Sequence, residues 1–210
     1  TGESPTLTAD EKARLWAAVV EVAGGDRVMA GTSTYSTAES VELTRLAEKA
    51  GAGSLLLVTP YYNKPPQSGL VAHFSAIAGA TGLPCMLYNI PGRTACTIEV
   101  PTMVRLFERL DNVVAVKDAV GDMAAASRLH RDTGEMEQYS GDDKNLLPLL
   151  AVDSEAQLWI VYVVAFVQAF GHHDDIGGAV PGSMPSAATS VYEEGLMVPP
   201  IKLWDRGVRN

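Results

Sequence analysis

Residues 113–119 read Val113-Val-Ala-Val-Lys-Asp-Ala119, in which an apolar run over residues 113–116 is followed by a lysine and an aspartate. Such a run is typical of a strand in a parallel sheet, because that strand is covered on both of its faces. Comparable runs recur along the chain, each followed by a loop and an amphipathic segment. They occupy residues 28–30, 54–58, 85–87 and, more weakly, 138–139. The repetition predicts strands that alternate with helices.

The segments between the runs carry signals for helix ends. Thr8-Ala-Asp-Glu11 and Ser36-Thr-Ala-Glu39 both read as capping boxes. Asp122 is placed to cap a helix over residues 123–131, which Gly134 would end. Strands and helices that alternate at intervals of about 25 to 30 residues indicate an α/β fold of the (β/α)8 TIM-barrel type. A doubly wound sheet is the main alternative, because periodicity does not separate the two.

Polar side chains follow several of the predicted strands, at the sheet edge where α/β proteins build their sites. A lysine desolvated there, such as Lys117, would have a lowered pKa, and its neutral amine could form a Schiff base with a ketone. Tyr88 could relay protons, and Arg93 could bind a carboxylate. Each has a plainer reading when taken alone: a solvated charge, a tyrosine that caps the core, and a surface ion pair.

Composition narrows the class of protein. The chain of 210 residues is 47% hydrophobic and 20% charged, as globular proteins are, and its net charge of -9 disfavours nucleic acid and anionic membranes as partners. The longest apolar stretch, residues 158–170, is shorter than the roughly 20 residues of a membrane helix. Two cysteines, Cys85 and Cys96, indicate no disulfide framework and fit a reducing cytoplasm.

Five segments together resemble the dihydrodipicolinate synthase family, in order and in spacing, over residues 1–152. They are Thr-Gly-Glu-Ser at 1–4, Val-Thr-Pro-Tyr-Tyr-Asn-Lys-Pro at 58–65, Tyr-Asn-Ile-Pro-Gly-Arg-Thr at 88–94, Val-Lys-Asp-Ala at 116–119 and Ser-Gly-Asp-Asp at 140–143. The resemblance implies a class I aldolase, a lyase that condenses pyruvate with aspartate semialdehyde to 4-hydroxy-tetrahydrodipicolinate. That reaction belongs to lysine and diaminopimelate biosynthesis, and the family is implied to be homotetrameric and cytoplasmic.

The same resemblance implies catalytic roles. Lys117 would be the Schiff-base lysine, Tyr88 the proton relay and Thr1 the second threonine of the family's Gly-Thr-Thr-Gly-Glu loop. Tyr62 would match the tyrosine that each subunit lends to its neighbour's site.

The implied substrates are a small keto acid and an aldehyde. Arg93, with Gly92 and Thr1, would bind substrate, and Arg93 would hold the carboxylate of the semialdehyde. No dissociable cofactor is implied, since pyruvate is held as a covalent imine of the lysine.

Residues from about 158 to 210 resemble a second family, the B subunit of hydantoinases and 5-oxoprolinases. The matching segments are Gly-His-His-Asp-Asp-Ile-Gly-Gly-Ala-Val-Pro-Gly-Ser-Met-Pro at 171–185 and Tyr-Glu-Glu-Gly-Leu-Met-Val-Pro-Pro-Ile-Lys-Leu at 192–203. We therefore expect a partial aldolase barrel at 1–152, without counterparts of the first two strands and the last, joined to a hydantoinase B-like fragment at 153–210.

This second resemblance provides the alternative functions. His173 and Asp175 are candidate ligands for a divalent metal in a hydantoinase-type hydrolase, and a polar turn is the plainer reading. A chimeric remnant without turnover is the third hypothesis.

Overall fold

The computed structural model describes residues 3–152, 204–205 and 208–209. The chain divides into two compact units, Thr1–Val167 and Gln168–Asn210. The described strands of the first unit form one parallel sheet in the order β1-β2-β3-β4-β5. Their bounds are Met29–Gly31 for β1, Ser54–Val58 for β2, Cys85–Asn89 for β3, Val113–Asp118 for β4 and Glu137–Ser140 for β5. In the second unit, β6 (Trp204–Asp205) pairs antiparallel with β7 (Val208–Arg209).

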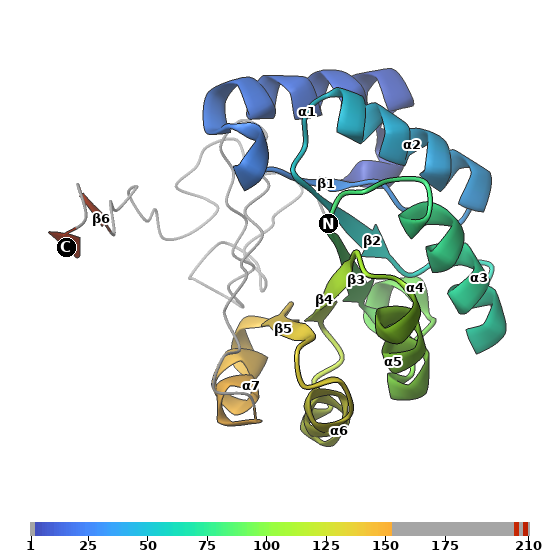
Figure 1. Cartoon of the computed structure of the whole chain (residues 1–210), viewed down its shortest axis with the longest axis vertical. Coiled ribbons are helices and arrows are strands. Elements are labelled where there is room, and N and C mark those ends of the chain that lie inside the picture. The colour runs from blue at the N-terminus through green and yellow to red at the C-terminus, as the bar shows by residue number, and fades with distance from the viewer. Residues whose placement is uncertain (1–2, 153–203, 206–207, 210) are drawn as a thin grey trace, which may run out of the picture. The chain divides into compact units, whose positions relative to one another are not determined.

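Helices cover one face of the parallel sheet. Figure 1 shows them as an arc around one side of the strands. They are α1 (Ala9–Ala23), α2 (Thr37–Lys49), α3 (Gln67–Ala78), α5 (Val100–Arg109), α6 (Met123–Thr133) and α7 (Leu146–Val152), with a short α4 (Pro91–Thr94) after β3. Three short 3-10 turns are η1 (Ser4–Thr6), η2 (Gly25–Arg27) and η3 (Asp143–Asn145).

The strand order decides between the two α/β architectures that the sequence left open. A doubly wound sheet reverses its strand order at a switch point and carries helices on both faces. Here every described parallel strand pairs with the next one in the chain, and the helices lie along a single side. The doubly wound alternative is therefore wrong for the described residues, and the arrangement is that of consecutive βα units of a barrel.

The observed strands differ from the predicted runs mainly at their carboxyl ends. The second run was predicted with its observed bounds, and β1 begins one residue later than predicted, at Met29. The third and fourth strands each continue two residues further, to Asn89 and Asp118. Their polar ends stay in the ladder because Tyr88 pairs with Lys117, and Asn89 with Asp118. Tyr88 and Lys117 thus lie within strands and not in the loops that follow.

The two predicted capping boxes form, one completely and one by half. The Thr8 hydroxyl accepts a hydrogen bond from the Glu11 amide, and the Glu11 carboxylate accepts one from the Thr8 amide. The Ser36 hydroxyl likewise accepts from the amide of Glu39 at 3.3 Å. The carboxylate of Glu39 instead accepts from the Thr34 hydroxyl at 3.0 Å, so it ties the preceding loop to α2.

Replacing Thr8 with alanine should lower the free energy of unfolding by about 1 kcal/mol, because the first turn of α1 loses the acceptor for an amide. Thr8→Ser keeps that hydroxyl and is the matched control, with a loss of only a few tenths of a kcal/mol expected. Urea unfolding of the three proteins measures the difference. Equal losses in the alanine and serine variants would show that the cap contributes nothing.

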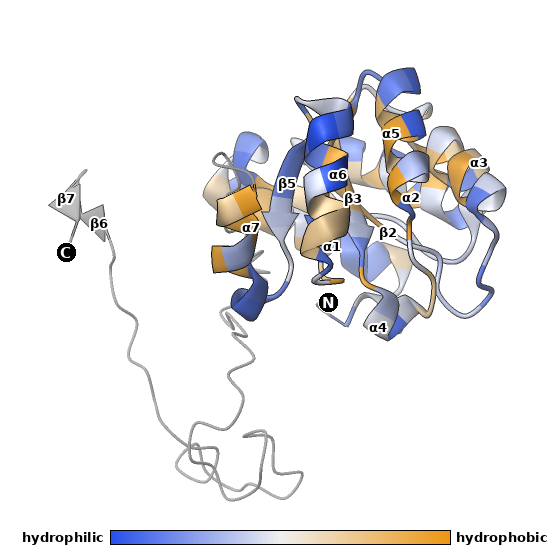
Figure 2. Ribbon diagram, turned by 90° about the horizontal axis from the view of Figure 1, so that it is seen from below, coloured by the Kyte–Doolittle hydropathy of each residue, from blue (hydrophilic) through white to orange (hydrophobic). Residues whose placement is uncertain are grey.

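Side chains along each strand alternate between the two faces of the sheet, and each face carries its own apolar cluster. The outer face, which we define as the face under the helices, carries Leu55, Leu57, Leu87 and Val116, each with no exposed surface, packed with helix residues such as Phe74. Figure 2 shows hydrophobic and hydrophilic residues alternating around α3 and α5, as expected for amphipathic helices. The opposite face, the inner face, carries a smaller cluster of Met86, Ala115 and Tyr139, with Met29 and Leu56 packed against it.

Among the described residues, no helix combines the length and the apolar character needed to cross a lipid bilayer.

Candidate active site around Lys117

A register irregularity turns Lys117 to the inner face. Val113 pairs with Cys85, but Ala115 and not Val114 pairs with Met86, so one residue of β4 is left over. After this bulge the alternation of β4 is reversed, because one extra residue moves every later side chain to the other face. Val116 therefore packs under the helices, and Lys117 lies on the inner face beside Tyr88 of β3.

Lys117 and Tyr88 contact each other directly. The Nζ atom of Lys117 lies 4.5 Å from the centre of the Tyr88 ring. Burial lowers the pKa of Lys117, because desolvation disfavours the ammonium form. Burial also raises the pKa of Tyr88, which keeps the phenol protonated. The pair thus combines an amine that is easier to deprotonate with a proton-bearing hydroxyl.

Arg93 is close enough to Tyr88 to act on it electrostatically. It lies on α4, which starts at Pro91 just after β3, and its charge opposes part of the rise in the pKa of Tyr88. The Arg93 side chain is exposed, so it can reach an anionic ligand. A Cβ added at Gly92 would meet no atom within 4 Å, so the turn beside Arg93 faces open space. The structure therefore brings together Lys117, Tyr88 and Arg93.

Tyr62 stands apart from this group within one chain. Its side chain is 91% exposed on the loop after β2, and its backbone has a φ of 72°. A left-handed backbone costs a tyrosine of order 1 kcal/mol, and exposure of a large ring to water gains nothing in return. The preceding Tyr61 packs edge-to-face on Tyr35, with ring centres 5.3 Å apart, which holds the loop. Thr1 lies outside the described residues.

Two residues that the sequence reasoning did not single out also border Lys117. Tyr139 pairs with Lys117 across β4 and β5, is buried, and donates a hydrogen bond to Glu137 on the same face. A Cβ at Gly141 would lie 3.2 Å from Cε of Lys117. Tyr139 ends the weakest of the apolar runs. Its place beside Lys117 could be predicted only if that run was recognised as the strand next to β4.

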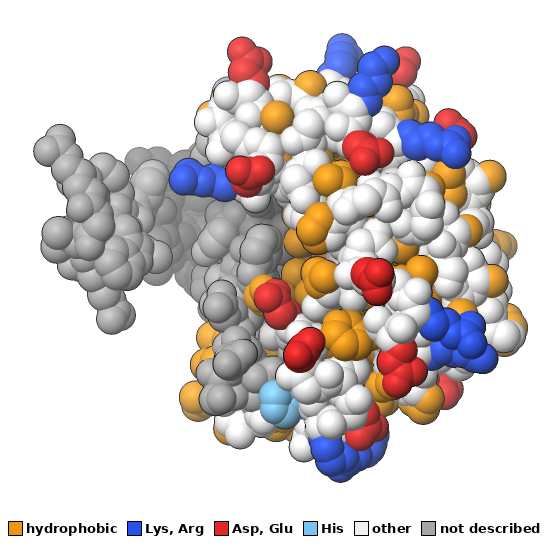
Figure 3. Space-filling model, viewed as in Figure 1, with side chains coloured by type: hydrophobic (Ala, Val, Ile, Leu, Met, Phe, Trp, Pro, Cys, Tyr) orange, Lys and Arg blue, Asp and Glu red, His pale blue; other side chains and the backbone are white. Residues whose placement is uncertain are grey.

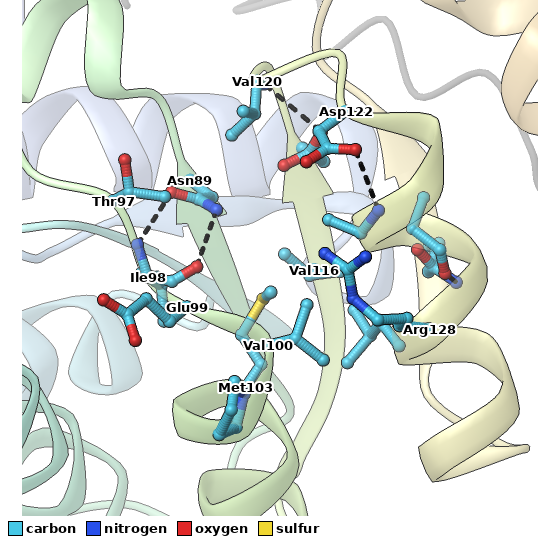
Figure 4. Close-up of a pocket in the computed structure, with 16 residues that line it drawn as sticks. Asn89, Thr97, Ile98, Glu99, Val100, Met103, Val116, Val120, Asp122 and Arg128 are labelled. Atoms are coloured by element: carbon cyan, nitrogen blue, oxygen red, sulfur yellow. Dashed lines mark hydrogen bonds between the residues drawn. The ribbon is translucent and has the colours of Figure 1, made fainter.

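A cavity of about 320 Å³ lies on the outer face, between α5 and α6 (Figure 4). Two of its polar side chains are bonded within the chain: the Asn89 amide bonds both backbone groups of Ile98, and the Asp122 carboxylate accepts from the Ala125 amide. Asp118 accepts from two loop amides, although burial raises the pKa of this carboxyl. The cavity is on the opposite face from Lys117 and is distinct from the candidate site.

The charged surface shows no single-sign patch on the face drawn in Figure 3, where acidic and basic side chains of the described residues are interspersed. Within residues 3–152, no group of three or more His, Cys, Asp or Glu side chains is placed to hold a metal ion. The candidate ligands His173 and Asp175 lie outside the described residues.

Comparison with known families now identifies the family to which this sheet belongs. Residues 1–159 match the dihydrodipicolinate synthetase family, which is most of the chain. The chain belongs to the dihydrodipicolinate synthetase family. Residues 153–210 match the hydantoinase B/oxoprolinase family, as the sequence predicted for that segment.

Individual members of the dihydrodipicolinate synthetase family are similar over the same region. The 4-hydroxy-tetrahydrodipicolinate synthase of Acidothermus cellulolyticus is 60% identical over 154 residues, which are 72% of this chain and 49% of that protein. The crystal structure of dihydrodipicolinate synthase from Aquifex aeolicus superimposes with a TM-score of 0.72 at 40% identity, covering 75% of this chain and 54% of that one. A monomeric dihydrodipicolinate synthase variant gives 0.70 at 35% identity, with 75% and 54% covered.

The chain spans about half the length of the dihydrodipicolinate synthases that it matches. Family membership confirms the resemblance that the sequence motifs indicated, and the superposition confirms the parallel α/β arrangement of residues 3–152. The roles of the individual site residues remain predictions.

Proposed function

We propose that residues 1–152 carry the pyruvate-binding half of a 4-hydroxy-tetrahydrodipicolinate synthase, a class I lyase. The observation that carries this proposal is the placement of the Lys117 amine over the Tyr88 ring on the inner face, 4.5 Å from its centre. In the proposed reaction, the Lys117 nitrogen attacks the keto carbon of pyruvate, and the keto oxygen leaves as water to give the imine. Loss of a methyl proton converts the imine into an enamine, whose carbon attacks the aldehyde carbon of aspartate semialdehyde while the aldehyde oxygen takes up a proton.

The neighbouring residues support proton transfer and substrate binding in this scheme. Tyr88 keeps its proton because burial raises its pKa, so it can protonate the oxygen that departs as water. Arg93 is exposed beside it and would bind the semialdehyde carboxylate, with Gly92 leaving the approach open. Thr1 would take part in the proton relay. No metal or dissociable cofactor takes part in the proposed steps.

Quaternary structure is part of the proposal. The exposed ring and the left-handed φ of Tyr62 are explained if a second subunit covers it, so that Tyr62 completes the neighbour's site. We propose the homotetramer that the resemblance implied, although one similar solved structure is of a monomeric variant. A cytoplasmic location is also proposed, and the free thiols of Cys85 and Cys96 support it.

Borohydride trapping tests the proposal on the full chain. Incubation with pyruvate followed by borohydride should convert the imine to a stable secondary amine on Lys117. The expected mass gain is that of pyruvate minus water plus two hydrogens, located by peptide mapping. Oxalate or acetate, which offer no ketone, should give no adduct. An unmodified Lys117 after reduction, in a folded protein, would contradict the proposal.

The second family match supports a second candidate function for residues 153–210. We propose that this segment is a hydantoinase B-like fragment with His173 and Asp175 as candidate ligands of a divalent metal. Elemental analysis after dialysis against zinc should then find bound metal that His173→Ala loses. Equal metal content in the wild type and in His173→Ala would contradict this metal site. The proposed function would then rest on residues 1–152 alone. A remnant without turnover would show neither the adduct nor the metal.

A further inference from the structure

We infer that Gly141 is a positioning residue for Lys117, and that its missing side chain provides the room in which the lysine amine meets a keto acid. The inference rests on the proposed Schiff-base function of Lys117 and adds a residue that neither the motif nor the strand pattern assigned. It depends on three observations: the face on which Gly141 lies, its ordinary backbone conformation, and the atoms that surround its Cα.

Gly141 lies on the inner face, directly after β5. Its amide donates to the carbonyl of Asp118 at 2.7 Å, which continues the ladder between β4 and β5 by one residue. Glu137 and Tyr139 point to the inner face, so the next position in that alternation is Gly141. Any side chain at residue 141 would therefore project to the face that carries Lys117.

The backbone does not require glycine at this position. Four described glycines have a positive φ, and these are Gly24, Gly51, Gly121 and Gly134. Gly141 is not among them, so an L-residue could adopt its conformation without strain. What glycine provides at residue 141 is space.

That space is bordered by the lysine itself. A Cβ at residue 141 would lie 3.2 Å from Cε of Lys117, 3.0 Å from Cβ of Ala119 and 3.2 Å from the carbonyl oxygen of Asp118. Each distance is shorter than an ordinary van der Waals contact, and the flexible Lys117 side chain can yield more easily than the other two. A methyl group would therefore displace the lysine from its position over Tyr88 and occupy volume that the substituents of the imine carbon need.

The test uses Gly141→Ala and a matched control, Gly82→Ala. Gly82 is exposed, has no positive φ, and a Cβ there would meet no atom within 4 Å. Displacement of a reacting atom by about 1 Å can cost on the order of 100-fold in rate. We expect the rate of borohydride trapping with pyruvate to fall about 10- to 100-fold in Gly141→Ala and to stay unchanged in Gly82→Ala.

A second readout does not need pyruvate. The rate of acetylation of Lys117 by acetic anhydride is followed against pH, with exposed lysines such as Lys144 in the same digest as internal references. Gly141→Ala should change the titration midpoint of Lys117. If the wild-type chain acetylates at Lys117 but traps no pyruvate, the proposed function fails, while the titration still decides the role of Gly141.

A compensating variant separates positioning from a folding defect. Ala119→Gly removes the nearest of the three neighbours, so in the double variant the new methyl group can shift away from Lys117. Adding Ala119→Gly to Gly141→Ala should restore at least part of both the trapping rate and the titration midpoint. The inference is overturned if Gly141→Ala traps pyruvate within twofold of wild type with an unchanged midpoint. It is equally overturned if the folded double variant shows no recovery.

Discussion

Replacing Lys117 with arginine is expected to reduce borohydride trapping of pyruvate by about 10³-fold or more, which in practice abolishes the adduct. Arginine keeps the length and the positive charge, but its guanidinium is not deprotonated in proteins and forms no imine under these conditions. Lys117→Met, with a neutral chain of similar shape, should fail in the same way. Both results would be measured as the rate of mass gain on the intact protein.

Two further variants show whether the loss of the pyruvate adduct is specific to Lys117. Lys144→Arg changes an exposed lysine that pairs with Asp142 and should trap pyruvate at the wild-type rate. Tyr88→Phe keeps the ring under Nζ of Lys117 but removes the phenol, so trapping should slow by about 10²-fold and still reach Lys117. Persistent trapping in Lys117→Arg would show that another amine reacts, and the assignment of Lys117 would then be wrong.

The second large effect concerns acid stability and depends on His73. This histidine of α3 is 5% exposed and lies between two hydroxyls, with Nε2 3.2 Å from Oγ of Ser33 and Nδ1 2.8 Å from Oγ1 of Thr37. The Ser33 hydroxyl donates its one proton to the carbonyl of Val58, so it must accept from Nε2. In the neutral ring Nδ1 then accepts from the Thr37 hydroxyl, so both bonds form without a charge in the core.

Burial lowers the pKa of His73 from 6.5 to about 4. The unfolded chain therefore takes up a proton near pH 6.5, and the folded chain resists protonation until about pH 4. Stability from this residue is complete above pH 6.5, declines as the pH falls toward 4, and changes no further below that. The total loss is at most about 3 kcal/mol.

His73→Gln removes the titration and keeps an amide that can donate and accept. Urea unfolding of both proteins between pH 7.5 and 4.5 should give wild type the higher free energy of unfolding at neutral pH. The difference between the two proteins should shrink by about 2 to 3 kcal/mol on acidification. Contributions of carboxylates common to both proteins cancel in the difference. An advantage that does not vary with pH would mean that His73 is not protected from protonation in the folded state.

Much of the local structure could be predicted because its causes are local. The apolar run at residues 54–58 became β2 with the predicted bounds, and the reciprocal hydrogen bonds of Thr8 and Glu11 formed as the capping motif indicated. The second capping motif formed by half, since Glu39 found a nearer donor in Thr34 of the preceding loop. That competition depends on how the loop before α2 folds back toward Glu39. The four-residue capping motif holds no information about the path of that loop.

The site was predicted in part for the same reason. Tyr88, Arg93 and Lys117 were identified from motifs at strand ends, and the structure places them together. Tyr139 and Gly141 were missed as site residues, because their relation to Lys117 arises across strands and not along the chain. Gly141 lies in the Ser-Gly-Asp-Asp segment at 140–143, but that motif gave it no role, because its proposed significance lies in a side chain that is absent.

The sequence by itself determined that strands and helices alternate and that a lysine follows the apolar run beginning at Val113. It did not determine which way that lysine points. Strict alternation from the buried Val113 would have turned Lys117 under the helices, and the unpaired residue at Val114 reverses this. Only the pairing of β4 with β3 decides that reversal, because register is a property of two strands. The tertiary structure thus placed the amine over Tyr88 and away from the apolar core.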